Sequence, residues 1–141
     1  MVALLNLMAL DVGERRIGLA VANSTNLLST PLKTLTFSGS VNEEISELIK
    51  ANEIDVLVVG LPKNLNDEDT DQTRFVRSFT DKLQKTVKIP INYENEALSS
   101  ARAKKTLEQS KKPYQKSDID SLAACFILDD YMANNKEVLG V

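Results

Sequence analysis

The first residue of this sequence that could do chemistry is a carboxylate that ends an apolar stretch. Asp11 follows the run LLNLMAL at 4–10, and a turn with Gly13 and the pair Arg15 and Arg16 come directly after it. A carboxylate in this place contributes little to packing but can ligate a metal ion, and the guanidinium groups beside it suit phosphate. The pattern therefore predicts a site where a divalent cation and a phosphate group meet.

Two further acids stand at comparable positions in the chain. Glu96 follows a strand-like stretch at 89–95, just before a helical pattern, and Asp120 falls in the first turn of the last predicted helix. Phosphodiester cleavage with two metal ions needs carboxylates from different elements that hold Mg²⁺ or Mn²⁺ ions about 3.5–4 Å apart. Because Mg²⁺ takes oxygen ligands and keeps several waters, a few acids suffice. We predict Asp11, Glu96 and Asp120 as catalytic metal ligands, with Mg²⁺ or Mn²⁺ as the cofactor.

Each of these acids also has a purely structural interpretation. Asp11 could be a turn residue that accepts backbone N–H groups. Glu96 could be a solvated residue before a helix, and Asp120, like Asp118, could simply favour the positive end of the helix dipole. The three acids in this order favour a shared site over three separate coincidences.

The basic residues form local groups rather than a general positive field, because the formal net charge is −3. Nucleic acid would therefore bind to a local patch, where lysine and arginine side chains contact phosphates. We predict nucleic-acid contacts from Arg15, Arg16, Arg74, Arg77, Lys111 and Lys112. The alternative is that the helical arginines and the lysine-rich loop form an ordinary solvated surface.

Composition narrows the possible function classes. The absence of histidine excludes Ser-His-Asp and Cys-His catalysis and zinc sites with histidine ligands. The lone Cys125 cannot form an internal disulfide, lies among apolar residues that predict burial, and fits a reducing, cytoplasmic location. The longest apolar run, near residues 2–10, is too short to cross a membrane and lacks signal-peptide features. A chain of 141 residues predicts one domain over 1–141.

The elements that must position these side chains follow from hydrophobic periodicity. Strands are predicted at 4–10, 17–22, 32–37, 55–60 and 89–95, and helices at 41–52, 71–86, 99–108 and 118–134. Ser117 is the expected N-cap of the last helix. The hairpin-like start and the later alternation of strand and helix predict an α/β fold. Its mixed sheet has an antiparallel arrangement of the first three strands and is flanked by helices.

Four motifs give the chain a resemblance to a known family. The segments are Asp11–Ala20 for Asp-x-Gly-x-Lys/Arg-Arg-Ile-Gly-x-Ala, Val58–Pro62 for Val-Val-Gly-Leu-Pro, Asn95–Ser100 for Asp-Glu-Arg-Leu-Thr-Thr, and Asp120–Ala124 for Asp-x-x-Ala-Ala. Together they resemble the YqgF-type family, whose members are described as Holliday junction resolvases or as pre-16S rRNA nucleases. The resemblance covers nearly the whole chain. It implies an RNase H-like fold, acidic site residues at Asp11, Glu96 and Asp120, and a basic pair at Arg15 and Arg16.

The third motif departs from the family pattern. Asn95 replaces the family Asp, Ala97 replaces the Arg, and two serines replace the threonines. An amide is a weaker metal ligand than a carboxylate, and loss of the Arg removes a cation for phosphate. These changes bear on catalytic rate more than on fold. Glu94 has the same strand parity as Glu96 and could supply the missing charge.

The resemblance implies a metal-dependent nuclease that acts on structured RNA at the 5′ end of pre-16S rRNA. One alternative is a resolvase of branched DNA, which would need a homodimer rather than a monomer to present two active sites. A second is an RNA-binding factor whose site has decayed at Asn95 and Ala97. An actin-like phosphotransferase is disfavoured because the chain is too short for two domains. No membrane partner is expected.

Overall fold

The computed structural model describes residues 4–96 and 99–140, and a single mixed sheet organises them. The strands are β1 (Asn6–Val12), β2 (Arg16–Asn23), β3 (Thr30–Thr36), β4 (Val56–Leu61) and β5 (Ile91–Asn95). Their order across the sheet is β3-β2-β1-β4-β5. Strands β1, β2 and β3 pair antiparallel with one another, as predicted, while β4 pairs parallel with β1 and β5 pairs parallel with β4.

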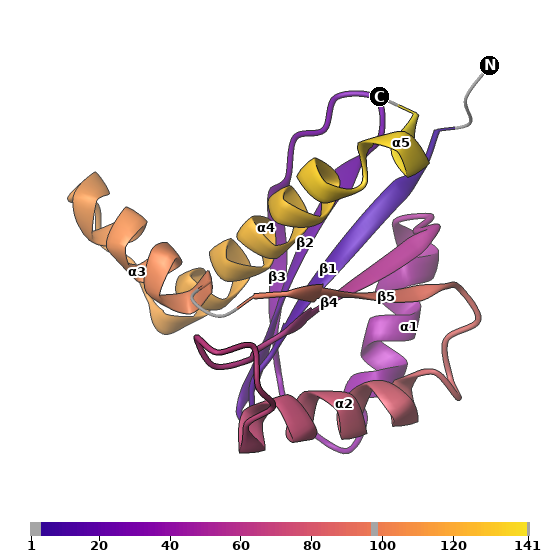
Figure 1. Ribbon diagram of the computed structural model, residues 1–141, viewed down its shortest axis with the longest axis horizontal. Helices are drawn as coiled ribbons and strands as arrows, with labels where there is room; N and C mark the ends of the chain where they lie inside the picture. The colour runs from indigo at the N-terminus through magenta and orange to yellow at the C-terminus, as the bar shows by residue number, and fades with distance from the viewer. Residues whose placement is uncertain (1–3, 97–98, 141) are drawn as a thin grey trace.

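Helices cover both faces of this sheet. They are α1 (Val41–Ala51), α2 (Asp71–Leu83), α3 (Ser99–Ser110), α4 (Lys116–Asn134) and the short α5 (Lys136–Leu139), which the sequence analysis did not predict. Helix α4 runs across the strands on one face, and α3 projects to one side of the molecule (Figure 1). No helix among the described residues is long and apolar enough to cross a membrane.

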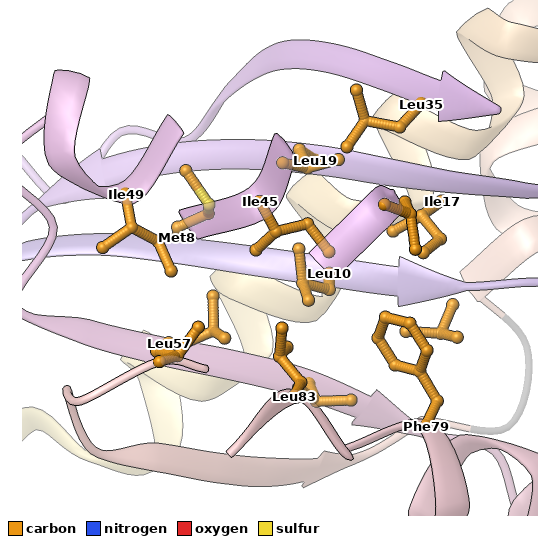
Figure 2. Packing of buried hydrophobic residues seen from close by; sticks show 14 of the residues in the cluster. Met8, Leu10, Ile17, Leu19, Leu35, Ile45, Ile49, Leu57, Phe79 and Leu83 are labelled. Carbon is orange, nitrogen blue, oxygen red and sulfur yellow. The ribbon is translucent and has the colours of Figure 1, made fainter. Parts of the chain in front are cut away.

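Strand periodicity divides the core into two layers. Met8 and Leu10 of β1 pack with α1 and α2, and Figure 2 shows them among side chains of neighbouring strands and of both helices. Leu7 and Ala9 point the other way and pack against α4. Side chains alternate along a strand, so Asp11 shares the face of Leu7 and Ala9. The first candidate metal ligand therefore lies on the α4 face of the sheet.

Two glycines allow α4 to approach this face closely. A β-carbon at Gly18 would overlap the backbone carbonyl of Asp120, and one at Gly60 would overlap the side chain of Ile127. Gly18 needs glycine because the backbone of α4 occupies the space of a side chain, whereas at Gly60 the overlapping atoms belong to the end of the Ile127 side chain. The Gly60 backbone belongs to the Val58–Pro62 motif. In the structure the partner that approaches it is α4.

The start of α4 differs from the sequence prediction. The helix begins at Lys116 with Gln115 as the N-cap residue, so the expected N-cap at Ser117 was wrong. The reason is the Asp118 carboxylate, whose Oδ2 accepts the Gln115 backbone N–H at 2.8 Å and stabilises a helix start two residues earlier. Asp120 consequently lies in the second turn, not in the first.

Cys125 is buried on the sheet side of α4, as predicted. Burial is the largest of several effects on its thiol, whose pKa is raised to about 11. A thiol with such a pKa is not a nucleophile near neutral pH.

Candidate active site

Strand pairing and helix packing bring two of the three predicted acids together. Asp11 is paired with Gly18 on the neighbouring strand β2. Helix α4 crosses directly over Gly18, at the backbone of Asp120. A small residue beside Asp11 thus lets the second carboxylate come close to the first from an element more than 100 residues away in sequence.

The electrostatics of Asp11 reflect this crowding. Its pKa is raised from the ordinary 3.8 to about 7, first by burial and then by the negative charge of Asp120. Both effects disfavour the charged carboxylate. A bound divalent cation would remove both, because it replaces lost hydration and offsets the repulsion between the two acids. Two carboxylates with oxygen donors at one place fit Mg²⁺ or Mn²⁺ by their chemistry.

Arg16 already supplies one positive charge at this place. Its Nε donates to Asp120 Oδ2 at 2.6 Å, with 37% of the arginine side chain and 17% of the aspartate side chain exposed. The same two residues line a polar pocket together with Gly13, Glu14, Arg15 and Gln72. The Gln72 side chain, from the first turn of α2, donates to the Val12 carbonyl at 3.2 Å. The pocket therefore joins the ends of β1, β2, α2 and α4.

Glu96 has a different set of partners. Its backbone N–H donates to the Leu61 carbonyl at 3.0 Å, which continues the β4–β5 pairing beyond the strand. Its side chain is only 9% exposed and accepts from Arg102 Nη1, which lies 3.5 Å from each carboxylate oxygen. Arg102 also donates to Asp130 at 3.0 Å and lies 4.6 Å from the centre of the Phe126 ring. This carboxylate thus belongs to a group that links β5, α3 and α4.

Glu94 lies on β5, two residues before Glu96 and on the same face of the sheet. It is paired with Gly60 on β4, and the β1–β4 register, continued by one residue, places Asp11 on the other side of Gly60. The two acids therefore lie in one row, two strands or about 10 Å apart. Asn134 donates to Glu94 at 2.9 Å, and burial is the main cause that raises the pKa of this carboxyl. The sequence analysis had pointed to Glu94 because it has the same strand parity as Glu96.

No group of three or more acidic, histidine or cysteine side chains in the described parts of the chain is arranged to hold one metal ion. Asp11 and Asp120 form a close pair, and Glu96 is engaged with Arg102. The convergence of all three acids on one ion stays a prediction. Arg102, by contrast, is a site residue that the sequence analysis did not select. The only signal for it was its membership of the basic segment after Glu96.

The predicted nucleic-acid contacts are distributed unevenly. Arg15 and Arg16 line the pocket beside the acidic pair. Arg74 is exposed and ion-paired with Asp71, its neighbour one turn earlier in α2. Arg77 pairs with Asp69 at 3.4 Å and lies 5.7 Å from the centre of the Tyr93 ring, on the opposite face of the sheet from α4. Lys111 and Lys112 are exposed in the connection to α4, the helix that carries Asp120.

Comparison with solved structures identifies the fold. The chain is similar to RuvC of Thermus thermophilus, solved in complex with a Holliday junction substrate, with a TM-score of 0.57 at 12% identity over 92% of this chain and 95% of RuvC. A second RuvC structure from that organism gives a TM-score of 0.56. The fold is therefore RNase H-like, as the resemblance implied.

Sequence relatives place the chain more narrowly. A protein of Sulfurihydrogenibium sp. (strain YO3AOP1) named "Putative pre-16S rRNA nuclease" is 38% identical over 128 residues, which cover 89% of this chain and 88% of the relative. A protein of the same name from Mycoplasma mobile is 34% identical over 131 residues, or 90% of this chain and 91% of the relative. The family model described as RuvX, Holliday junction resolvase, matches residues 5–134. The chain therefore belongs to the RuvX family, as its four motifs had indicated.

Proposed function

We propose that this protein is a metal-dependent nuclease that hydrolyses phosphodiester bonds in structured RNA, with the 5′ end of pre-16S rRNA as its substrate. The observation that carries the proposal is the closeness of Asp11, near the C-terminal end of the central strand β1, to Asp120 of α4. Burial and the Asp120 charge together raise the pKa of Asp11, so a cation at this point is favourable. The names of the sequence relatives supply the RNA substrate.

In this proposal each part of the site has a distinct task. Asp11 and Asp120 hold Mg²⁺ or Mn²⁺ through carboxylate oxygens. The bound cation supplies an activated water and stabilises charge on the phosphate. Arg15 and Arg16 line the adjacent pocket and bind a neighbouring phosphate of the chain. Glu96 would be the third acid of the site, and its carboxylate is held by Arg102 in the structure.

The distribution of charge supports a nucleic-acid partner. Residues 99–116, which include α3 and the connection to α4, contain six lysine and arginine side chains and one glutamate, a net charge of +5. The other residues of the chain contain 11 basic and 19 acidic side chains, a net charge of −8. A basic segment next to the helix that carries Asp120 provides a local surface for a phosphate backbone.

A second candidate function is the resolution of branched DNA. The description of the matching family as a Holliday junction resolvase favours it. The same acids would perform the same chemistry, but two sites would have to face a substrate with two-fold symmetry. A resolvase would therefore be a homodimer, whereas an RNA nuclease could act as a monomer. For either substrate we place the protein in the cytoplasm.

A cleavage assay separates these possibilities. Wild-type protein is incubated with a 5′-extended 16S rRNA precursor and with a four-way DNA junction, each with Mg²⁺, Mn²⁺ or EDTA. We expect metal-dependent cleavage of the RNA and its loss in Asp11→Asn. Asp118→Asn is the matched control, because it keeps the acceptor of the α4 cap two residues from Asp120.

Other outcomes would change the assignment. Cleavage of the junction alone, by a dimer in size-exclusion chromatography, would favour the resolvase. RNA binding without cleavage of either substrate would favour an RNA-binding factor whose site has decayed at Asn95 and Ala97. Equal cleavage by wild type and Asp11→Asn would show that the activity comes from another site or from a contaminant.

A further inference from the structure

Two of the three candidate metal ligands are each paired with an arginine. Arg16 from β2 donates to Asp120 at 2.6 Å. Arg102 from α3 donates to Glu96 at 3.5 Å and to Asp130 at 3.0 Å. The two arginines come from different elements, and the two carboxylates do as well. Asp11, in contrast, has its pKa raised by burial and by Asp120.

An arginine at such a carboxylate can have either of two effects on metal binding. A residue that orients a ligand supports the metal, and its loss typically weakens metal affinity by about 10–100-fold. A cation that occupies the ligand opposes the metal, because a guanidinium and a dication then compete for the same negative charge. Removal of the arginine should therefore lower metal affinity in the first case and raise it in the second, which distinguishes the two roles.

The geometry points to competition. Arg16 takes an oxygen of Asp120 in a short, charge-assisted hydrogen bond, so its positive charge lies on the same carboxylate that would bind the cation. Arg102 donates to Glu96 and Asp130 through the same Nη1 atom and stacks on Phe126. This arrangement holds Glu96 toward α3 and α4. A residue that merely oriented Glu96 toward a metal would not need to share its donor with a second acid.

We propose that Arg16 and Arg102 act as internal counter-ions that compete with the divalent cation for Asp120 and Glu96, and that substrate phosphates relieve this competition. Phosphate groups attract guanidinium groups strongly, so a bound nucleic acid draws both arginines away from the acids. Metal and nucleic acid then bind cooperatively, and the free protein holds metal weakly. Arg102 is in this scheme a positioning residue that acts through Glu96. The inference rests on the proposed function, because it assumes that these acids bind metal.

The first experiment measures Mn²⁺ binding by isothermal titration calorimetry without substrate. We expect Arg16→Gln and Arg102→Gln each to bind Mn²⁺ about tenfold more tightly than wild type, and Arg102→Lys to remain close to wild type. Lys82→Gln is the control, since it removes one positive charge from an exposed position on α2 and should leave Mn²⁺ affinity unchanged. Thermal melts confirm that each variant is folded, and Arg16→Gln carries the test if Arg102→Gln is not.

The second experiment measures the coupling to nucleic acid. A short RNA duplex is added with Ca²⁺ in place of Mn²⁺, so that the metal binds without supporting cleavage. Wild type should bind Ca²⁺ at least fivefold more tightly in the presence of RNA, and the Arg16→Gln/Arg102→Gln double variant should lose most of this gain. Equal RNA effects in both proteins would overturn the proposed relief by phosphate.

Different Mn²⁺-binding results would overturn the counter-ion role and the proposed function. Variants that bind Mn²⁺ equally or more weakly than wild type, while Asp11→Asn abolishes binding, would overturn the counter-ion role and leave the nuclease site intact. No Mn²⁺ binding by wild type or by any arginine variant would overturn the metal site itself, and the inference with it.

Discussion

Asp11→Asn should make the metal-free protein more stable, and the gain should depend on pH. The folded protein holds this carboxyl at a pKa of about 7 instead of 3.8, so the unfolded chain releases the proton first as pH rises. The free energy of unfolding of the wild type therefore falls between about pH 4 and pH 7 and levels off above that range. Asparagine has the same shape but does not ionise, so the variant escapes this loss.

The size of the effect follows from the two pKa values. The difference between 3.8 and about 7 corresponds to about 4 kcal/mol at pH 8. Because water and neighbouring groups relax around a partly exposed carboxylate, we expect about 2 kcal/mol as the measured gain. At pH 5 less than half of the gain should be present, since only a small part of the proton-linkage range has then been crossed.

Urea denaturation in EDTA at pH 5 and pH 8 measures this gain. Asp81→Asn, an exposed position on α2, is the control and should change stability by less than about 0.5 kcal/mol at either pH. Addition of Mg²⁺ should stabilise the wild type and not Asp11→Asn, because only the wild type keeps the ligand. A loss of stability in the variant, or a gain of equal size at both pH values, would refute the assignment of Asp11 as an acid whose pKa the fold raises.

Three further predictions concern other parts of the molecule. Gly18→Ala should destabilise the protein by about 1–3 kcal/mol in thermal denaturation and lower activity, because its β-carbon would push α4 away from the sheet. Gly39→Ala is the control and should be nearly neutral, because a β-carbon there meets open space. Replacement of Lys111 and Lys112 by Gln should weaken RNA binding and lower the slope of log affinity against log salt by about 1.5, measured by fluorescence anisotropy; an unchanged slope would contradict their role. Cys125 should react with a thiol reagent at pH 8 only when the protein is unfolded, because the thiol is buried and its pKa is about 11; rapid labelling of the native protein would be inconsistent with this burial.

The sequence determined the parts of this protein that depend on local patterns. Alternation and helical spacing predicted the order of strands and helices, because each period is set within a few residues. The run from Asp11 to Gly18 also predicted a β-hairpin, since a short turn between two apolar stretches joins them as antiparallel strands. The start of α4 was missed by two residues because a helix boundary depends on which side chain reaches back to cap it, here Asp118.

The tertiary structure decided which charged groups meet. Arg16 and Asp120 are 104 residues apart in sequence, and they form an ion pair only because α4 lies against Gly18. Similarly, Glu96 is engaged by Arg102 because α3 folds back on α4, a contact that no local period encodes. The sequence could therefore name the acids of the site, whereas their partners and burial, and the raised pKa of Asp11, follow from long-range packing that brings separate elements to the C-terminal end of β1.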